Sequence, residues 1–207
     1  NYDRSHVILN LSCNHQPDEV KKIVYAALSA GYSHFLLVPG DLLNGRRPIQ
    51  NTTSLAALVR EAAAGTHLSL GASLNPHSSQ LPKLTLPRLY RDFGISFLQT
   101  QAVSVGDMDK VEQAQLFLSK FGVNVPVAYG VLRGDNEGRI LEHAKQFNMP
   151  IPADVQEAYR NGKSQDEAVV LSMAGLHQHG ITNFLLMNAA PVTGRLIKDY
   201  MNRIGKV

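Results

Sequence analysis

The 207-residue chain has little cysteine, and it lacks tryptophan and any long apolar run. Its one cysteine, Cys13, excludes an internal disulfide framework and fits a reducing compartment, so we expect a protein of the cytoplasm or the mitochondrial matrix. No apolar segment approaches the roughly 20 residues that span a bilayer, which predicts no direct membrane insertion. Charged residues make up 18% of the chain and hydrophobic ones 44%, which excludes an intrinsically disordered protein.

The sequence also lacks the signatures of several functional classes. The formal net charge is only +3, and the basic residues are scattered, so we expect no nucleic-acid partner. The sequence contains no G-x-S-x-G elbow, which would indicate a serine nucleophile. It also contains no H-E-x-x-H motif and no cysteine cluster, either of which would indicate a metal site. His177 and His179 lie two residues apart on a predicted helix and so point in different directions. Cys13 is close to His15, but a single cysteine is more often a small core residue than a nucleophile.

What the chain does have is a repeated unit of a short apolar strand, a polar loop and an amphipathic helix that ends at a glycine. The predicted strands are 6–11, 34–38, 67–73, 96–101, 125–132 and 183–188. The predicted helices are 17–30, 54–64, 86–93, 108–121, 137–147, 153–159, 166–179 and 193–204. The segment from Pro17 to Glu19 is typical of a helix start, with proline in the first turn and acids at the positive end of the helix dipole.

Alternating units of this length predict a parallel α/β sheet with right-handed crossovers. A doubly wound sheet would usually open with a glycine-rich turn, and no G-x-G-x-x-G follows the first strand. Polar residues follow every strand instead of gathering at one switch point. This favours a (β/α) TIM-barrel-like fold, in which about six of the eight βα units are present. We expect residues 1–207 to form a single domain.

Ligands of such folds bind at the carboxyl ends of the strands. Asp41 is a candidate there because Pro39 and Gly40 end a buried strand immediately before it. Amide, hydroxyl and carboxylate groups that converge on one rim predict a ligand pocket. The polar residues that follow successive strands are Asn10 to His15, Asp41, Ser73 to His77, Thr100 and Gln101, Arg133 to Asn136, and Asn188. The pair Arg46 and Arg47 could meet an anion, although exposed arginine pairs are usually only solvated.

The order of several short motifs resembles the methylenetetrahydrofolate reductase family over essentially the whole chain. The motifs are Leu-Ser-Cys from Leu11, Pro-Asp-Glu-Val from Pro17, Val-Pro-Gly-Asp from Val38, Asn-Pro-His from Asn75, Thr100-Gln101, Val-Pro-Val-Ala-Tyr-Gly-Val-Leu from Val125, and Ile-Pro-Ala from Ile151. The match begins at what would be the third strand of that family. The resemblance implies a (β/α)₈ barrel that binds FAD and, in one-carbon metabolism, reduces methylenetetrahydrofolate with NAD(P)H.

The resemblance also implies roles for individual residues. Asp41 falls on the aspartate that lies beside the flavin and the folate, so it is the catalytic candidate and also a cofactor-binding one. Gln101 falls on a folate-contacting glutamine, and His77 on a histidine near the cofactor. Asn10 stands where the family has a histidine, so it is a cofactor-binding candidate by position. Arg88, with Arg91, is what remains of a basic pair that binds the FAD phosphates.

The departures from the family are larger than the matches. The glutamate general acid of the family lies on its first strand, which has no counterpart here. The segment around Asn188, a substrate-binding candidate, lacks the tyrosine and arginine that the family uses for folate. A barrel without two of its strands leaves sheet edges that natural proteins cover.

We therefore expect a diverged, non-catalytic accessory or structural subunit, a pseudoenzyme, whose open barrel edge is covered by other protein chains. One alternative is an active FAD-dependent reductase that an upstream segment or a partner chain completes. Another is a folate or nucleotide binding module without turnover.

Overall fold

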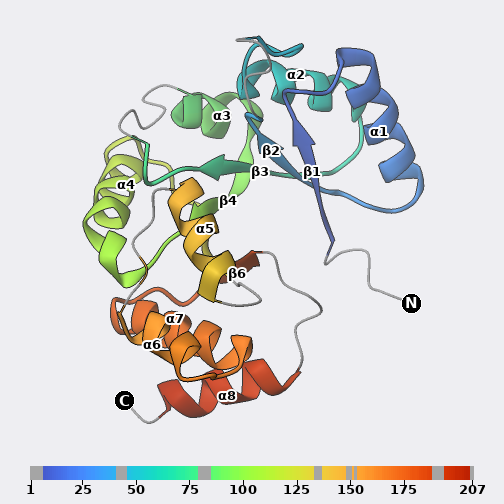
Figure 1. The fold of residues 1–207 in the computed structure, drawn as a ribbon. Helices are drawn as coiled ribbons and strands as arrows, with labels where there is room; N and C mark the ends of the chain where they lie inside the picture. The colour runs from blue at the N-terminus through green and yellow to red at the C-terminus, as the bar shows by residue number, and fades with distance from the viewer. Residues whose placement is uncertain are drawn as a thin grey trace. The chain divides into compact units, whose positions relative to one another are not determined.

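The computed structural model describes residues 7–40, 46–78, 85–132, 137–147, 151, 153–187 and 194–205 (Figure 1). The strands are β1 (Ile8–Ser12), β2 (His34–Val38), β3 (Ser69–Leu74), β4 (Ile95–Ala102), β5 (Val127–Leu132) and β6 (Phe184–Met187). The helices are α1 (Pro17–Ser29), α2 (Thr52–Ala62), α3 (Thr85–Phe93), a short 3₁₀ turn η2 (Val105–Asp107), α4 (Met108–Lys120), α5 (Glu137–Phe147), α6 (Ala153–Arg160), α7 (Gln165–Gln178) and α8 (Gly194–Ile204). Every predicted element is present within a few residues of its predicted bounds.

The helix boundaries follow from local chemistry. Helix α1 starts at Pro17, and the backbone N–H of Gln16 donates to the Glu19 carboxylate at 3.3 Å. Helix α2 begins two residues earlier than predicted because Asn51 caps it, with its Oδ1 accepting from the Ser54 N–H at 2.9 Å. The glycines predicted to end helices all have positive φ; they are Gly31, Gly65, Gly94, Gly122 and Gly180.

The six strands form one sheet in the order β1-β2-β3-β4-β5-β6. Each of the pairs β1–β2, β2–β3 and β5–β6 is parallel. Six parallel strands that follow one another in sequence order, with helices between them, confirm the predicted (β/α) TIM-barrel-like fold. Among the described residues, none of the helices has both the length and the apolar character needed to cross a bilayer.

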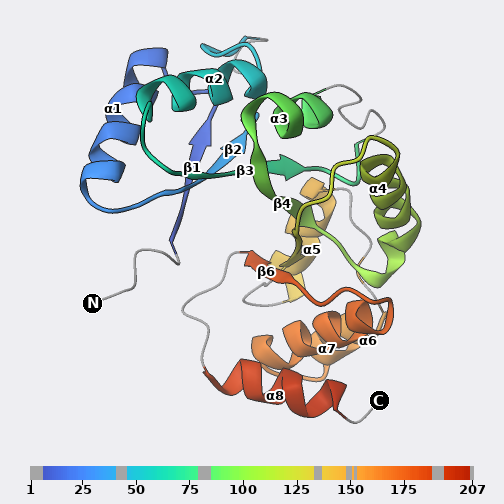
Figure 2. The same ribbon diagram turned by 180° about the vertical axis from the view of Figure 1, so that it is seen from behind.

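The chain divides into two compact units, and β4 contributes to both. Unit 1 consists of Asn1–Leu74, Pro82–Leu98 and Leu118–Pro126. In unit 1 the helices α1 and α2 lie side by side next to β1–β3 (Figures 1 and 2). Leu11, Leu37 and Ala72 share one row of the sheet, and all three are buried.

The opposite face of the same three strands carries Asn10, Leu36 and Gly71 in register. Asn10 is exposed there, whereas Leu36 is buried. A Cβ atom added to Gly71 would collide with the ring of Phe97 on β4, so glycine is required for that ring to lie against β3. The polar side chain of Asn10 is thus on the face of the sheet opposite to that of Leu11, Leu37 and Ala72.

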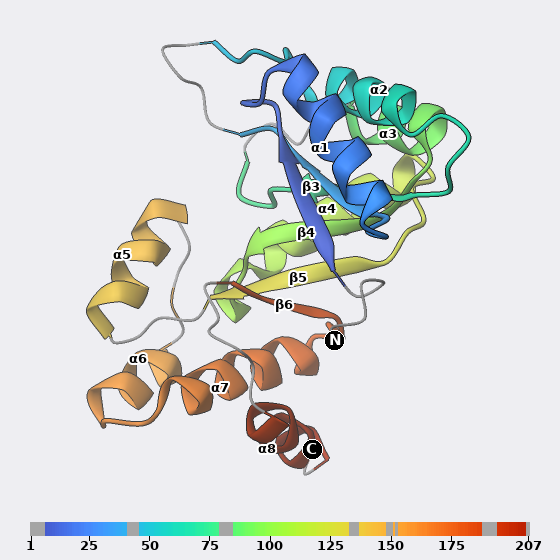
Figure 3. The same cartoon turned by 90° about the vertical axis from the view of Figure 1, so that its right-hand side faces the viewer.

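Unit 2 consists of Asn75–Leu81, Gln99–Phe117 and Val127–Val207. Its core joins β5 and β6 to α7 and α8, which are drawn in orange to red in Figure 3. The rings of Phe184 on β6 and Tyr200 on α8 meet edge to face, with their centroids 5.6 Å apart. Gly130 on β5 allows β4 to approach closely, because an added Cβ would lie 2.9 Å from the backbone of Gln101 and Ala102.

Candidate functional site

The candidate site lies at the carboxyl end of β4, in unit 2. After Ala102 the chain turns through Ser104 into η2, and the side chain of Asp107 folds back onto that turn. The backbone N–H and the hydroxyl of Ser104 both donate to Asp107 Oδ2, at 3.0 and 2.9 Å. Asp107 has no exposed surface, so these donors replace the water that its carboxylate would otherwise bind.

His77 follows β3 and is held against the same end of β4. Its Nε2 lies 2.7 Å from the carbonyl oxygen of Ala102. A carbonyl can only accept, so Nε2 carries a proton. The side chain is 4% exposed, and its Nδ1 lies 3.5 Å from Asp107 Oδ1. The imidazole is therefore fixed in both position and orientation.

Lys110, on the first turn of α4, completes the group. Its Nζ donates to Asp107 Oδ1 at 3.1 Å and lies 3.5 Å from His77 Nδ1. The Lys110 side chain is 32% exposed, whereas the carboxylate below it is fully buried. We call these three residues the His77–Asp107–Lys110 cluster. It presents one ammonium group to solvent beside a fixed imidazole, which suits the binding of an anion or of a hydrogen-bond acceptor.

Gln101 lies on β4 directly before the Ala102 carbonyl that binds His77, and its side chain is half-buried. Its backbone oxygen accepts from the hydroxyl of Thr100 at 2.7 Å, and that hydroxyl oxygen accepts from the Gly130 N–H at 3.0 Å. The structure thus brings His77 and Gln101 to the same end of the same strand. Their roles in binding a cofactor or a substrate stay predictions.

The other predicted site residues are not part of this cluster. Asn10 and Arg88 belong to unit 1, where Asn10 is exposed on β1 and Arg88 is exposed on α3. Arg88 Nε lies 3.4 Å from the carboxylate of Asp92, and Arg91 also binds Asp92, at 2.7 Å. The hydrogen bond from Arg91, followed by the two guanidinium charges, lowers the pKa of Asp92. Asp41 and Asn188 lie outside the described residues.

Two members of the cluster, Asp107 and Lys110, were not predicted as site residues. Both fall in a segment whose pattern predicts only the start of a helix, and no motif marks them. A signal that could have drawn attention to Asp107 is the sequence Ser-x-x-Asp at Ser104, which is typical of a helix cap. Its contact with His77 spans 30 positions in sequence, however, and depends on how β3 and β4 are placed.

The side chains for which we expected no catalytic or metal-binding role have structural contacts. Cys13 is fully buried, and burial raises the pKa of its thiol, with a smaller opposing effect of the Arg47 charge. His15 Nδ1 lies 3.7 Å from the Glu19 carboxylate. His177 Nδ1 lies 3.0 Å from the hydroxyl of Tyr200. Across the described part of the chain, no three His, Cys, Asp or Glu residues are placed to hold a metal ion.

Comparison with known proteins gives a structural match without a sequence match. No protein-family model matches the chain, and no curated protein matches it. Among solved structures, the chain is similar to an uncharacterized protein from Clostridium thermocellum that binds two copies of 5-methyl-5,6,7,8-tetrahydrofolic acid. The TM-score is 0.58 at 15% identity, over 96% of this chain and 71% of that protein. At this identity the likeness concerns the fold.

Proposed function

We propose that this chain is a reduced-folate-binding domain of the methylenetetrahydrofolate-reductase type, and that the carboxyl end of β4 contacts the ligand. The observation that carries the proposal is the likeness of almost the entire chain to a protein that binds 5-methyltetrahydrofolate. The motif order around Asn75-Pro76-His77 and Thr100-Gln101 resembles the same folate-dependent family. The structural likeness and the motif order thus point to the same ligand class.

The chemistry of the site suits a pterin. The amide of Gln101 can both donate to and accept from the edge of a pterin ring. The Lys110 ammonium has three donors, of which one binds Asp107 Oδ1 and a second lies 3.5 Å from His77 Nδ1, so one donor remains for a ligand oxygen. The Ala102 carbonyl holds the His77 imidazole in one orientation, so that its ring can pack beside a bound pterin.

The direct test is titration calorimetry of the purified chain with 5-methyltetrahydrofolate. We expect saturable binding that the Gln101→Ala variant weakens by about tenfold or more, which corresponds to the loss of about 1.4 kcal/mol. Gln113→Ala, on the exposed face of α4, is the matched control and should bind as the unchanged chain does. Absence of binding, or equal weakening by both variants, would contradict the proposal.

We further propose that the domain acts without turnover, as an accessory or structural subunit. None of the six described strands contains an Asp or a Glu that could donate a proton from the sheet. In the described part of the chain the donors for FAD are also a poor fit, because Arg88 and Arg91 are exposed and both pair with Asp92. β1 and β6 are the outermost strands in the sheet order, which leaves edges that a partner chain could cover.

An absorption spectrum of the native protein, followed by an NAD(P)H oxidation assay with methylenetetrahydrofolate, separates this role from that of an active reductase. We expect no flavin band and no NAD(P)H oxidation. A flavin band together with substrate-dependent oxidation would replace the accessory role by the reductase, with folate binding retained. Saturable folate binding in the calorimetric titration, without a flavin band or NAD(P)H oxidation, would support a binding domain.

A further inference from the structure

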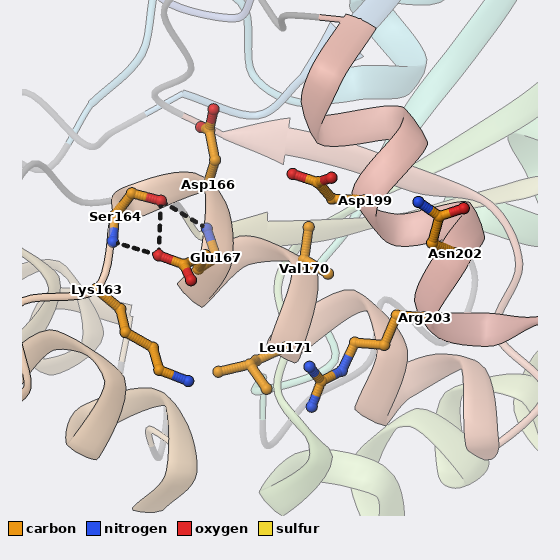
Figure 4. A pocket seen from close by; sticks show the side chains of 9 residues that line it. All are labelled: Lys163, Ser164, Asp166, Glu167, Val170, Leu171, Asp199, Asn202 and Arg203. Atoms are coloured by element: carbon orange, nitrogen blue, oxygen red, sulfur yellow. Dashed lines mark hydrogen bonds between the residues drawn. The ribbon is translucent and has the colours of Figure 1, made fainter. Parts of the chain in front are cut away.

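A cavity of about 660 Å³ lies in unit 2, between the first half of α7 and the last turns of α8 (Figure 4). It is separate from the His77–Asp107–Lys110 cluster, since none of those residues lines it. A volume of this size is in the range of pockets that hold small organic ligands. The folate-binding proposal above does not use this cavity.

Two cations occupy one end of the cavity. Lys163, just before α7, and Arg203, near the end of α8, extend toward each other on either side of Leu171 (Figure 4). Both residues are exposed, and across the described residues neither cationic group has a hydrogen bond or an ion pair. Two such groups facing one space are suited to a carboxylate, which can accept from both.

Carboxylates occupy the other end. Asp166 and Asp199 lie there, with Val170 between them and the two cations (Figure 4). Both aspartates have other polar contacts within the chain, but a carboxylate can accept about four hydrogen bonds. Val170 is 5% exposed, and with Leu171 it forms an apolar strip between the two charged ends.

The N-terminus of α7 does not offer free backbone N–H groups to a ligand in the cavity. Glu167 accepts from the N–H and the hydroxyl of Ser164, at 2.8 and 3.1 Å, and the Ser164 hydroxyl caps the helix by accepting from the Glu167 N–H at 3.3 Å. The helix end is therefore satisfied by its own residues. The ligand preference must come from the side chains that project into the cavity.

The charges of the lining exclude simple ions as ligands. Three carboxylates (Asp166, Glu167 and Asp199) face two cations (Lys163 and Arg203), so a polyanion would be repelled and a lone cation would leave the two basic groups unused. We propose that the cavity binds a zwitterion about the size of a dipeptide. Its carboxylate lies between Lys163 and Arg203, its ammonium group faces Asp166 and Asp199, and its apolar part packs on Val170 and Leu171.

The test titrates the whole chain with the dipeptide Ala-Leu and with two derivatives, each lacking one charge. We expect Ala-Leu to bind, and the N-acetylated and the C-amidated derivatives each to bind about tenfold or more weakly. No binding of Ala-Leu up to about 1 mM, or equal binding of all three peptides, would overturn the proposal. Because only the ligand changes, this comparison does not depend on any variant folding.

Variants then assign each charge to its end of the cavity. Arg203→Met should weaken the binding of Ala-Leu about tenfold but leave the weak binding of the C-amidated peptide unchanged. Asp199→Asn should also weaken the binding of Ala-Leu about tenfold, but leave the weak binding of the N-acetylated peptide unchanged. Lys22→Met, on the exposed surface of α1 in unit 1, is the matched control for the loss of a positive charge. Equal weakening by Lys22→Met would overturn the assignment. Folate titration of the Arg203→Met variant should be unchanged, so failure of this site and failure of the folate site are distinguishable.

Discussion

At the scale of single residues, Asp107 is a carboxylate that has lost all contact with water. It is tolerated because its two oxygens accept from the Ser104 N–H, the Ser104 hydroxyl and the Lys110 ammonium. Removing one partner of a buried charged group leaves the others unpaired, and this is more costly than losing an exposed ion pair.

We therefore expect Asp107→Ala to lower the free energy of unfolding by about 3–5 kcal/mol. Asp109→Ala, two positions further along and exposed, should change it by no more than about 0.5 kcal/mol. Urea unfolding followed by circular dichroism measures both. If the two variants unfold at the same urea concentration, the carboxylate of Asp107 does not stabilise the fold in the way that its contacts indicate.

The same residue shows how far site prediction from sequence extends. His77 and Gln101 were among the polar residues that topology predicts to meet at one sheet edge, and the family resemblance then singled them out. Asp107 and Lys110 were missed because their importance comes from a contact with His77, and no local pattern encodes that contact. Site chemistry that depends on distant segments is thus visible only in the folded chain.

At the scale of elements, the helix and strand boundaries were largely predictable because local residues determine them. Gly31 and Gly94 end their helices with φ of +83° and +60°, a conformation that glycine adopts most easily. The close pairing of β4 with β5 was harder to predict from the sequence. It depends on Gly130, whose place in a strand gives no sign that a neighbouring backbone approaches it so closely.

The two kinds of glycine should respond differently to substitution. Gly65 has φ +79° and open space around its Cβ direction, so Gly65→Ala should cost about 1–2 kcal/mol and Gly65→Asn less, since Asn tolerates that backbone. At Gly130 the obstacle is the backbone of β4, so both Ala and Asn should cost about 1–3 kcal/mol, with Asn the worse. Thermal unfolding of the four variants measures this order, and an Asn at position 130 that is better tolerated than Ala would refute the steric explanation.

Arg60 of α2 holds the end of α3. Its Nε donates to the Phe93 carbonyl at 3.0 Å, and its Nη2 donates to the same oxygen at 2.6 Å and to the Gly94 carbonyl at 3.3 Å. Burial lowers the pKa of the guanidinium somewhat from a value so high that the group remains charged.

Arg60→Ala should lower the free energy of unfolding by about 1.5–3 kcal/mol, because it leaves helix-end carbonyls without their charged donor. Arg60→Lys should recover only part of this loss, since an ammonium group lacks the fork that reaches both carbonyls. Chemical unfolding measures the three proteins, and Lys22→Ala on the exposed surface of α1 serves as the control. Full recovery by lysine would show that charge alone is sufficient.

At the scale of the whole molecule, the sheet order leaves β1 and β6 with one neighbouring strand each among the described residues. β1 also carries Ile8, a large apolar side chain that is 40% exposed. Strand edges with exposed apolar residues pair readily with other chains unless they are protected. The edge at β1 is therefore where we expect association.

We expect the purified chain to self-associate as its concentration rises, and Ile8→Lys to raise the dissociation constant by about tenfold or more, because a charge on an edge strand opposes pairing. Leu116→Lys adds the same charge to the exposed surface of α4 and should have little effect. Sedimentation velocity over a concentration series gives the dissociation constants of the unchanged chain and of both variants. A chain that stays monomeric throughout, or two variants with the same shift, would rule out association through this edge.

The burial of Cys13 also has a practical use. The single native thiol is enclosed by the core of unit 1, and its raised pKa leaves little thiolate at neutral pH. A cysteine introduced on the surface, for example Leu116→Cys, would then be the one group that a maleimide dye or spin label modifies quickly. Probes can be attached at chosen positions while the natural cysteine stays in place.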